Sequence, residues 1–485
     1  MRERKNTMAA FGKKKKASEF PDVIPVSEAI RKGDIFTKLT CLIMGAGNLA
    51  RKQIIQGLLF LTGELAYILY MVFYGAKALQ NFVTLGTETQ KKVFNEATQV
   101  YEYATGDNSQ LCLLYGVVTF FVTIGFILLW RAAIRSYIAQ KAQEAGKKPI
   151  TFGQILKDLK DNRMYQLFLL FPFLGIILFT VMPLVFMILM AFTNYDQQHL
   201  PPNSLFTWVG FKNFASLFSN SMTVTFGYSF RKVLGWTLVW AVMATFTTFI
   251  GGILLAKAIN SKTTKLPKMW RTLFIISIAV PQFVTLLLVR NFFADSGIVN
   301  TICSNIGITD MLKHAGLVGE HLTYIPFLTD PHWAKVMIIL INIWVGVPYQ
   351  MLIATGVLMN IPTDQIESAK IDGATNFQVF WKITMPYILF IQGPALITDF
   401  VKNINNFNVI YLLTQDVFVT QNQALANSHA KEVDLLVTWL FRLTNEYYDY
   451  KMASVIGIIV FIICAAFTLI SFSRMISGDK EEEYQ

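Results

Sequence analysis

The chain has 485 residues, of which 54% are hydrophobic and 15% are charged, and its formal net charge is +11. The mean hydropathy is +0.45. This composition excludes an ordinary soluble globular domain and predicts an all-α membrane protein.

Eight apolar runs are long enough to cross a bilayer, whose hydrocarbon core requires roughly 20 apolar residues per helix. We expect a basic cytoplasmic segment over 1–53, with at most one short amphipathic helix, and a cytoplasmic tail over 476–485. The predicted spans lie at 54–75, 111–132, 165–193, 231–257, 270–294, 335–358, 387–414 and 452–475.

Along the chain, loops rich in basic residues alternate with loops rich in acidic residues. KKKK at 13–16, the loop at 131–163 and the loop at 262–271 are basic, whereas the loops after the fifth and seventh spans are acidic. Basic loops remain in the cytoplasm, so both termini are predicted to be cytoplasmic. This one-sided placement explains the net charge without a nucleic-acid partner.

The residue types that usually carry catalysis or bind metals are scattered. The four cysteines lie in four different segments without CxxC spacing, the five histidines lie in outside loops, and no GxxxxGK[ST] sequence is present. We therefore expect no catalytic residue, metal or cofactor in this chain, and no ATP hydrolysis by it.

An amphipathic helix is predicted just before the third span. Thr151 can cap it, and Phe152, Ile155, Leu156 and Leu159 recur at helical spacing. Such a helix is expected to lie along the inner membrane surface.

The loop at 362–386 is charged and lies between two apolar runs, and its sequence predicts two short helices. Thr363 and Asp364 can start a first helix, Gly373 ends it, Thr375 can cap a second, and Pro386 leads into the seventh span. Such a knob either docks in a groove of a cytoplasmic partner or is an interfacial helix-turn-helix without a partner. The second helix is expected to present one apolar face, formed by Phe377, Phe380, Trp381 and Ile383.

The seventh run carries polar residues inside a membrane span. Asp399, Lys402, Asn403 and Asn406 follow one another at i, i+3, i+4 and i+7, so they are expected to share one helix face, with Asp399 and Lys402 paired. A charge at mid-span costs about 2.5–3.5 kcal/mol unless it is paired or wetted. The face is therefore expected to line a polar cavity for a sugar, or to bond to a second subunit.

The residues of the 362–386 loop resemble the EAA signature of ABC importer permeases. In that family, this loop engages the ATPase subunits. Ser368 stands where the family usually has a second small residue, and Ile383 and Pro386 fit the terminal Ile-x-x-Pro. The resemblance implies that the ATPase-coupling residues are Glu367, Ser368, Ala369, Asp372, Gly373, Ala374, Phe380, Ile383 and Pro386.

Most of the chain resembles the larger, eight-span permease of maltose-type sugar importers. The resemblance implies a six-helix type I importer core over 165–475, preceded by two additional helices with their basic loop over 54–164. The short outside loop at 194–230 suggests a Gram-positive-type transporter. The motifs are AFTNYD, WVGFKNFASLF, VPQFVTLLLVRNFF, SGIVN, WVGVPYQM, INNFNVIYLLT and DLLVTWLFRL.

The resemblance also implies where the sugar lies. Pro348 is expected to break the sixth span beside the cavity, and Pro281 with Gln282 could do the same in the fifth, although a simple kink is the preferred interpretation there. The implied substrate contacts are Gly346, Tyr349, Asp399, Lys402, Asn403 and Asn406, with Val345 adjacent.

The sequence is thus identified as the permease subunit of an ATP-driven importer of maltodextrin or a related oligosaccharide, in a bacterial cell membrane. The implied partners are a second homologous permease, two ATPase subunits that hold ATP and Mg, and an extracellular sugar-binding protein. The alternative is an ion-coupled secondary sugar transporter in which Asp399 and Lys402 are coupling charges. A membrane-embedded enzyme is disfavoured because clustered catalytic groups are missing.

Overall fold

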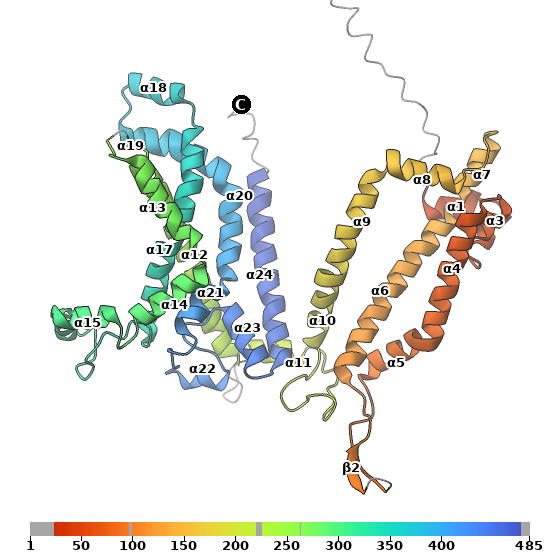
Figure 1. The fold of residues 1–485 in the computed structure, drawn as a ribbon, viewed down its shortest axis with the longest axis horizontal. Coiled ribbons are helices and arrows are strands. Elements are labelled where there is room, and N and C mark those ends of the chain that lie inside the picture. Colours follow the sequence, from red (N-terminus) through yellow and green to blue (C-terminus); the bar gives the residue numbers. More distant parts are fainter. Residues whose placement is uncertain (1–23, 97–98, 220–225, 262, 477–485) are drawn as a thin grey trace, which may run out of the picture. The chain divides into compact units, whose positions relative to one another are not determined.

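The computed structural model describes residues 24–96, 99–219, 226–261 and 263–476. KKKK at 13–16 and the tail from 477 lie outside the described residues. The chain forms two compact units (Figure 1). Unit 1 comprises Met1–Leu189 and Gln198–Trp208, and unit 2 comprises Met190–Gln197 and Val209–Gln485.

Unit 1 begins with three short helices where at most one was predicted, so that expectation was wrong. Their sequences are too short to show helical periodicity, and buried polar contacts hold them instead. Arg51, which is 4% exposed, pairs with Asp34 and donates to Thr37 Oγ1 (2.7 Å) and to the Ser136 carbonyl (3.0 Å). The helices are α1 (Val26–Lys32), α2 (Ile35–Leu39) and α3 (Ala46–Ala50).

Three long apolar helical segments follow, over Ile54–Thr84, Ser109–Glu144 and Met164–Met190, and all but the last residue of the third belong to unit 1. The predicted Thr151 cap is confirmed, because Thr151 and Gln154 form a capping box at the start of one helix. The component helices are α4 (Ile54–Tyr70), η1 (Met71–Gly75), α5 (Ala76–Thr84), α6 (Ser109–Ile134), α7 (Tyr137–Glu144), α8 (Phe152–Asp161), α9 (Met164–Ile176), η2 (Ile177–Val181) and α10 (Met182–Met190).

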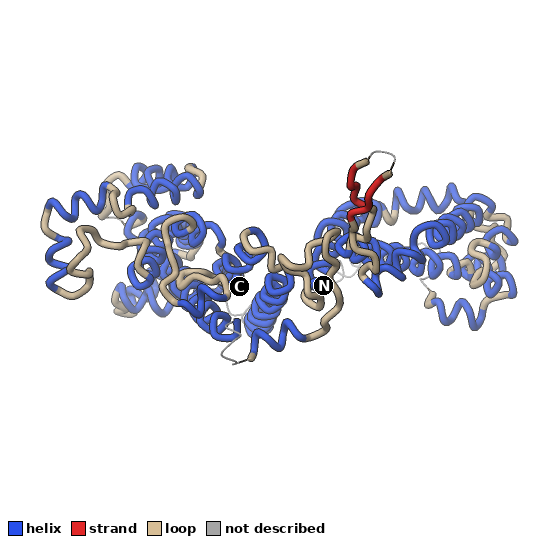
Figure 2. The backbone as a smooth tube through the Cα atoms, turned by 90° about the horizontal axis from the view of Figure 1, so that it is seen from below, coloured by secondary structure: helices blue, strands red, loops and turns tan. Residues whose placement is uncertain are grey.

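The loop between the first two spans contains a β-hairpin that the sequence reading missed. Strand β1 (Lys92–Asn95) pairs antiparallel with β2 (Val100–Tyr103), as the red strands of Figure 2 show. Four-residue strands give too little alternation to be recognised, although valine and aromatic residues favour them.

Unit 2 is built around the close packing of α12 (Phe226–Ile259) against α17 (Pro331–Met359). Two glycines of α12 permit this approach: a Cβ at Gly252 would lie 2.4 Å from Gln350 Cβ, and one at Gly251 would lie 2.8 Å from Val347 Cγ2. The two helices therefore pack backbone to backbone beside the cavity described below. Around them lie α11 (Lys212–Phe218), α15 (Ile298–Asn305), α16 (Ile308–His314), α22 (Gln423–Asn427), α23 (Leu436–Asn445) and α24 (Tyr450–Ile476).

The fifth span is broken and the sixth is not, which reverses the expectation for the two prolines. Helices α13 (Pro267–Ala279) and α14 (Gln282–Phe292) meet at 92° across Val280 and the exposed Pro281. Helix α17 continues through the buried Pro348. Packing against α12 on either side of Pro348 holds α17 together, whereas the chain at Pro281 follows the proline's preference for an extended preceding residue.

The seventh run also divides. Helices α18 (Thr363–Ile371), α19 (Asn376–Val379), η3 (Phe380–Thr384) and α20 (Met385–Ile404) precede the division, and α21 (Phe407–Thr414) follows it. Seven helices are long and apolar enough to span a membrane, and the bent pair makes eight, which confirms the predicted count for the described chain.

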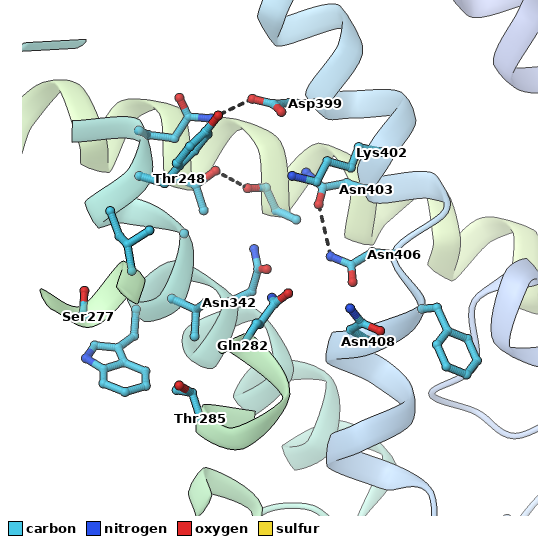
Figure 3. Close-up of a pocket in the computed structure, with 18 of the residues that line it drawn as sticks. Thr248, Ser277, Gln282, Thr285, Asn342, Asp399, Lys402, Asn403, Asn406 and Asn408 are labelled. Carbon is cyan, nitrogen blue, oxygen red and sulfur yellow. Dashed lines mark hydrogen bonds between the residues drawn. The ribbon is translucent and has the colours of Figure 1, made fainter. Parts of the chain in front are cut away.

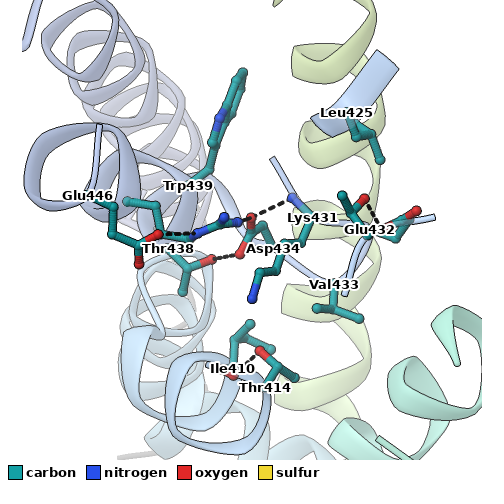
Figure 4. A network of polar contacts seen from close by, with 12 residues as sticks. Ile410, Thr414, Leu425, Lys431, Glu432, Val433, Asp434, Thr438, Trp439 and Glu446 are labelled. Atoms are coloured by element: carbon teal, nitrogen blue, oxygen red, sulfur yellow. Dashed lines mark hydrogen bonds and ion pairs between the residues drawn. The ribbon is translucent and has the colours of Figure 1, made fainter. Parts of the chain in front are cut away.

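A buried ionic network fixes the segment before α23 (Figure 4). Asp434, which is 2% exposed, pairs with Arg442 (3.0 Å) and accepts hydrogen bonds from the Lys431 backbone N–H (2.7 Å) and Thr438 Oγ1 (3.1 Å). Arg442 also pairs with Glu446 at 3.2 Å. Burial raises the pKa of the Asp434 carboxyl, and the Arg442 guanidinium opposes that rise. Both carboxylate oxygens of Asp434 thus have partners within the chain.

Candidate translocation site

A polar cavity of about 500 Å³ lies inside unit 2 (Figure 3). Helices α12, α17, α20 and α21 and the break between α13 and α14 surround it. Trp344, Tyr349 and Phe407 add aromatic rings to the lining. The polar side chains are those of Thr248, Ser277, Gln282, Thr285, Asn342, Gln350, Asp399, Lys402, Asn403, Asn405, Asn406 and Asn408.

The residues implied by the resemblance converge on this one cavity, although they come from two separate helical regions. Val345, on α17, lies among them. Their role in substrate binding remains a prediction. All six, namely Gly346, Tyr349, Asp399, Lys402, Asn403 and Asn406, line the cavity.

Two breaks in the helices supply much of the polar lining. At the first, Gln282 begins α14 directly after Pro281 and faces the cavity. At the second, α20 ends at Ile404, and Asn406 caps α21 by accepting a hydrogen bond from the Val409 backbone N–H (3.3 Å). Interrupted helices turn polar backbone and side-chain groups toward a cavity, as transporters often do.

The prediction that Asn406 continues one helix face with Asp399 was therefore wrong. The spacing argument holds for Asp399, Lys402 and Asn403, which all lie on α20. It fails at Asn406, because an asparagine side chain can bond to the backbone two or three residues ahead and start a new helix. Asn406 nevertheless reaches the same cavity.

The expected Asp399–Lys402 pair does not form. Asp399 Oδ2 instead accepts a hydrogen bond of 2.7 Å from Gln350 Nε2 on α17. Lys402 forms no ion pair within the described chain, and Figure 3 shows it beside Asn403, extended toward the cavity. The cavity therefore presents a carboxylate and an ammonium as separate groups.

Asn403 is fixed more firmly than its neighbours. Its Nδ2 donates to Thr245 Oγ1 (2.9 Å), its Oδ1 accepts from Asn406 Nδ2 (3.4 Å), and its carbonyl accepts from Trp240 Nε1 (3.0 Å). These contacts set the orientation of both amides before any ligand arrives, which reduces the entropy lost on binding.

Sequence reasoning missed several polar residues of this site, among them Gln350, Asn342 and Asn408. One signal was available, because Asn342, Gly346 and Tyr349 follow one another at i, i+4 and i+7 and so share a face of α17. No pattern along the chain indicated the contact of Gln350 with Asp399, since it joins two helices.

The 362–386 loop forms the predicted pair of helices. Thr375 caps the second through a capping box with Gln378, and Gly373 has a left-handed φ of +82°. Pro362 rather than Thr363 is the N-cap of α18, without a side-chain cap bond. Helix α19 continues through η3 into α20, so the knob and the cavity wall form one helical rod.

The aromatic residues of the second helix contact one another but differ in exposure. Phe377 and Trp381 are 71% and 51% exposed, whereas Phe380 is 8% exposed and packs into unit 2 beneath the Lys257 ammonium, 4.0 Å from its ring. The helix winds as a π-helix from Phe380 to Thr384. Among the implied coupling residues, Glu367, Ser368, Asp372 and Gly373 are exposed, and Ala369, Ala374, Ile383 and Pro386 are half-buried.

The polar and aromatic part of the cavity lining consists of amides, hydroxyls, aromatic rings and two charged side chains. The described residues contain no group of three or more His, Cys, Asp and Glu side chains that could hold a metal ion. Amides, hydroxyls and aromatic rings between interrupted spans are suited to holding a hydroxylated solute. Together with the knob, this arrangement defines a membrane transport permease.

Comparison with known proteins identifies the family. Residues 248–477 match the family described as the binding-protein-dependent transport system inner membrane component. The maltodextrin transport permease of Streptococcus pneumoniae is 32% identical over 448 residues, covering 92% of this chain and 96% of that protein. The galactooligosaccharide transport permease of Bacillus subtilis is 32% identical over 452 residues, covering 92% and 98%.

A solved bacterial ABC transporter that imports the polysaccharide alginate has the same fold. Its TM-score is 0.50 at 24% identity, with 67% of this chain and all of that chain covered. The chain belongs to the binding-protein-dependent transport permeases, and it is a multi-pass membrane subunit of an ABC importer.

Proposed function

We propose that this chain forms half of the translocation path of an ATP-driven importer for maltodextrin or a related oligosaccharide. The observation that carries the proposal is the polar cavity, whose amides and aromatic rings suit the hydroxyl edges and apolar ring faces of a sugar. Relatives equally similar over nearly the whole chain are named for maltodextrin and for galactooligosaccharides, so the substrate class is an oligosaccharide.

In this proposal, the Asn403 and Asn406 amides bond to sugar hydroxyls, and Tyr349 offers its ring to the sugar's apolar face. Gly346 lets α12 approach α17 beside the cavity, because a Cβ there would lie 2.7 Å from Thr248 Cγ2. Asp399 and Lys402 supply a charged acceptor and a charged donor that do not neutralise each other.

The proposed partners are a second homologous permease, two ATPase subunits that bind ATP and Mg, and an extracellular sugar-binding protein. The solved alginate transporter, described in complex with an oligosaccharide-bound periplasmic protein, supports a binding-protein partner. Relatives from Streptococcus and Bacillus support a bacterial plasma membrane of the Gram-positive type. The core that these partners contact is proposed to span 165–475.

The continuous rod of α19, η3 and α20 suggests how ATP acts on the cavity. A displacement of the 362–386 knob by the ATPases moves α20 as a body, and with it Asp399, Lys402 and Asn403. These residues then shift relative to α17, to which the Gln350–Asp399 hydrogen bond joins α20. The cavity can thereby alternate between inward and outward access.

Charge and shape changes on the knob test this coupling. Gly373→Arg and Glu367→Lys should each abolish oligosaccharide uptake into proteoliposomes that contain the complete transporter, because both residues are exposed where an ATPase groove would meet them. ATP hydrolysis should continue without responding to the binding protein, and the protein should still insert.

Gly153→Arg is the matched control, since Gly153 has open space around it on the exposed surface of α8. It should leave uptake unchanged. Normal uptake by both knob variants would reject the coupling role, and uptake that proceeds without ATP would reject the importer itself.

A further inference from the structure

A second cavity of unit 2, the outer pocket, has a volume of about 390 Å³ and shares no lining residue with the translocation cavity. Lys232 lines it from the second turn of α12, and Lys335 lines it from the second turn of α17. Residues around α22 close its third side. The distribution of basic loops predicts that the starts of α12 and α17 are extracellular.

The outer pocket lies on the same face of α17 as the translocation cavity. Lys335 of the pocket and Asn342 and Gly346 of the cavity follow one another at i, i+7 and i+11, spacings that place residues in one row along a helix. At a rise of about 1.5 Å per residue, Lys335 lies about 10 Å outward of Asn342. Val336 and Leu340 expose their apolar side chains on another side of the helix. The pocket is therefore on the path side of α17 and not on its apolar exposed side.

The acid of the outer pocket does not neutralise its two lysines from α12 and α17. Glu432 Oε1 accepts hydrogen bonds from the backbone N–H groups of Gln421 (2.9 Å) and Asn422 (2.7 Å), which ties this carboxylate to its own loop. Lys232 and Lys335 form neither an ion pair nor a hydrogen bond within the described chain, although both line the pocket.

The contacts that hold the lysines leave their charge uncompensated. Lys335 Nζ lies 5.0 Å from the centre of the Trp236 ring, and Lys232 Nζ lies 5.9 Å from the centre of the Tyr228 ring. A third lysine of the lining, Lys431, donates to a backbone carbonyl (3.1 Å). Three ammonium groups thus stand against one carboxylate that already has partners, and the pocket attracts an anion.

A carboxylate of a protein that binds transiently suits this pocket. Lys232 is exposed, so the pocket remains in contact with water. Charge pairs at such wet sites accelerate association, whereas the interfaces of permanent subunits are more apolar. A protein that delivers a sugar and leaves again in each cycle requires the first kind of contact. A neutral oligosaccharide has no charge to pair with the lysines.

We propose that the outer pocket receives an acidic side chain of the extracellular sugar-binding protein. This inference rests on the proposed function, which includes that partner. The carboxylate of the Asp or Glu side chain pairs with the Lys232 and Lys335 ammonium groups. These lysines belong to α12 and α17, the two helices that also wall the translocation cavity. Docking therefore joins the outer ends of both helices.

The dependence of uptake on the concentration of the binding protein tests the pocket. Proteoliposomes that contain the complete transporter are supplied with maltodextrin-loaded binding protein. Lys232→Glu and Lys335→Glu should each raise the concentration for half-maximal uptake about tenfold or more, with the maximal rate unchanged, because a like charge then faces the incoming carboxylate. Arg231→Glu is the matched control and should change neither value, since Arg231 is exposed on α12 outside the pocket.

Cross-linking of the wild-type complex guards against variants that fail to fold. A water-soluble carbodiimide joins an amine and a carboxylate only where they touch. It should form an amide between Lys232 or Lys335 and one acidic residue of the docked binding protein, which mass spectrometry locates. The double variant Lys232→Arg with Lys335→Arg should lose this amide yet keep uptake close to wild type, because it keeps both charges.

Each alternative occupant gives a different result. A lower maximal rate with an unchanged half-maximal concentration would assign the pocket to the sugar, and an amide to the second permease would assign it to the subunit interface. Either result, or an equal shift in Arg231→Glu, would overturn the proposal. Uptake that depends on the binding protein but ignores both glutamates would overturn the pocket alone, whereas uptake that needs no binding protein would overturn the proposed function as well.

Discussion

Two acid–base pairs of unit 2, Asp434 with Arg442 and Asp399 with Lys402, differ in how the protein holds their charges. Asp434 and Arg442 form an ion pair, with side chains only 3% and 10% exposed, surrounded by further hydrogen bonds. Asp399 and Lys402 lie three residues apart on one helix, yet each faces the cavity separately.

The difference separates structural charge from functional charge. A buried ion pair whose hydrogen bonds are all satisfied within the chain has nothing left to offer a ligand, and its loss is felt as stability. A carboxylate held by one neutral amide, beside an unpaired ammonium, keeps bonding capacity for a solute. The following substitutions test that distinction, from the largest expected effect to the smallest.

Arg442→Leu should destabilise unit 2 by about 3–5 kcal/mol, because it leaves the Asp434 carboxylate buried without its counter-ion. Thermal unfolding in detergent, followed by tryptophan fluorescence, measures the effect. Trp439 lies in α23 beside this network and reports on it. A loss below about 1 kcal/mol would mean that the network is no structural anchor.

Replacing both partners sharpens that result. The double variant Asp434→Leu with Arg442→Leu should recover most of the lost stability, since apolar replacement of a whole buried pair is often nearly neutral. Failure to recover would show that the hydrogen bonds of Asp434 to Lys431 and Thr438, rather than the ion pair, hold the segment.

Asp399→Asn should behave oppositely, with unfolding changed by less than about 0.5 kcal/mol, because the amide can still accept from Gln350. Uptake should fall about tenfold, corresponding to about 1.4 kcal/mol of lost interaction with the sugar. Asp416→Asn, at an exposed carboxylate of the outer surface, is the matched control and should leave uptake unchanged. Normal uptake by Asp399→Asn would remove Asp399 from the site.

Lys402→Met should have the smallest effect on unfolding, a change of less than about 0.5 kcal/mol, because the Lys402 side chain is exposed and forms no ion pair within the described chain. The same unfolding assay applies. A destabilisation of about 1 kcal/mol or more would reveal a structural partner and erase the contrast with Arg442.

The two mid-span prolines show how far sequence reasoning reaches. The expectation that a proline interrupts a span beside the cavity had the correct mechanism, because proline removes a backbone donor and constrains the residue before it. It named the wrong residue. Pro348 stays helical because α12 packs closely against α17 on both sides of it, whereas the exposed Pro281 has no such support.

The sequence by itself determined the number of spans, the two helices of the knob with their Thr375 cap and Gly373 turn, and six of the residues that line the cavity. Hydropathy, capping and glycine's tolerance of positive φ act over a few neighbouring residues, so they can be read along the chain. Two features were decided only by the tertiary structure: the broken span and the partner of Asp399. Each depends on which distant segment packs across a given residue, and packing between segments leaves no periodic mark in the sequence.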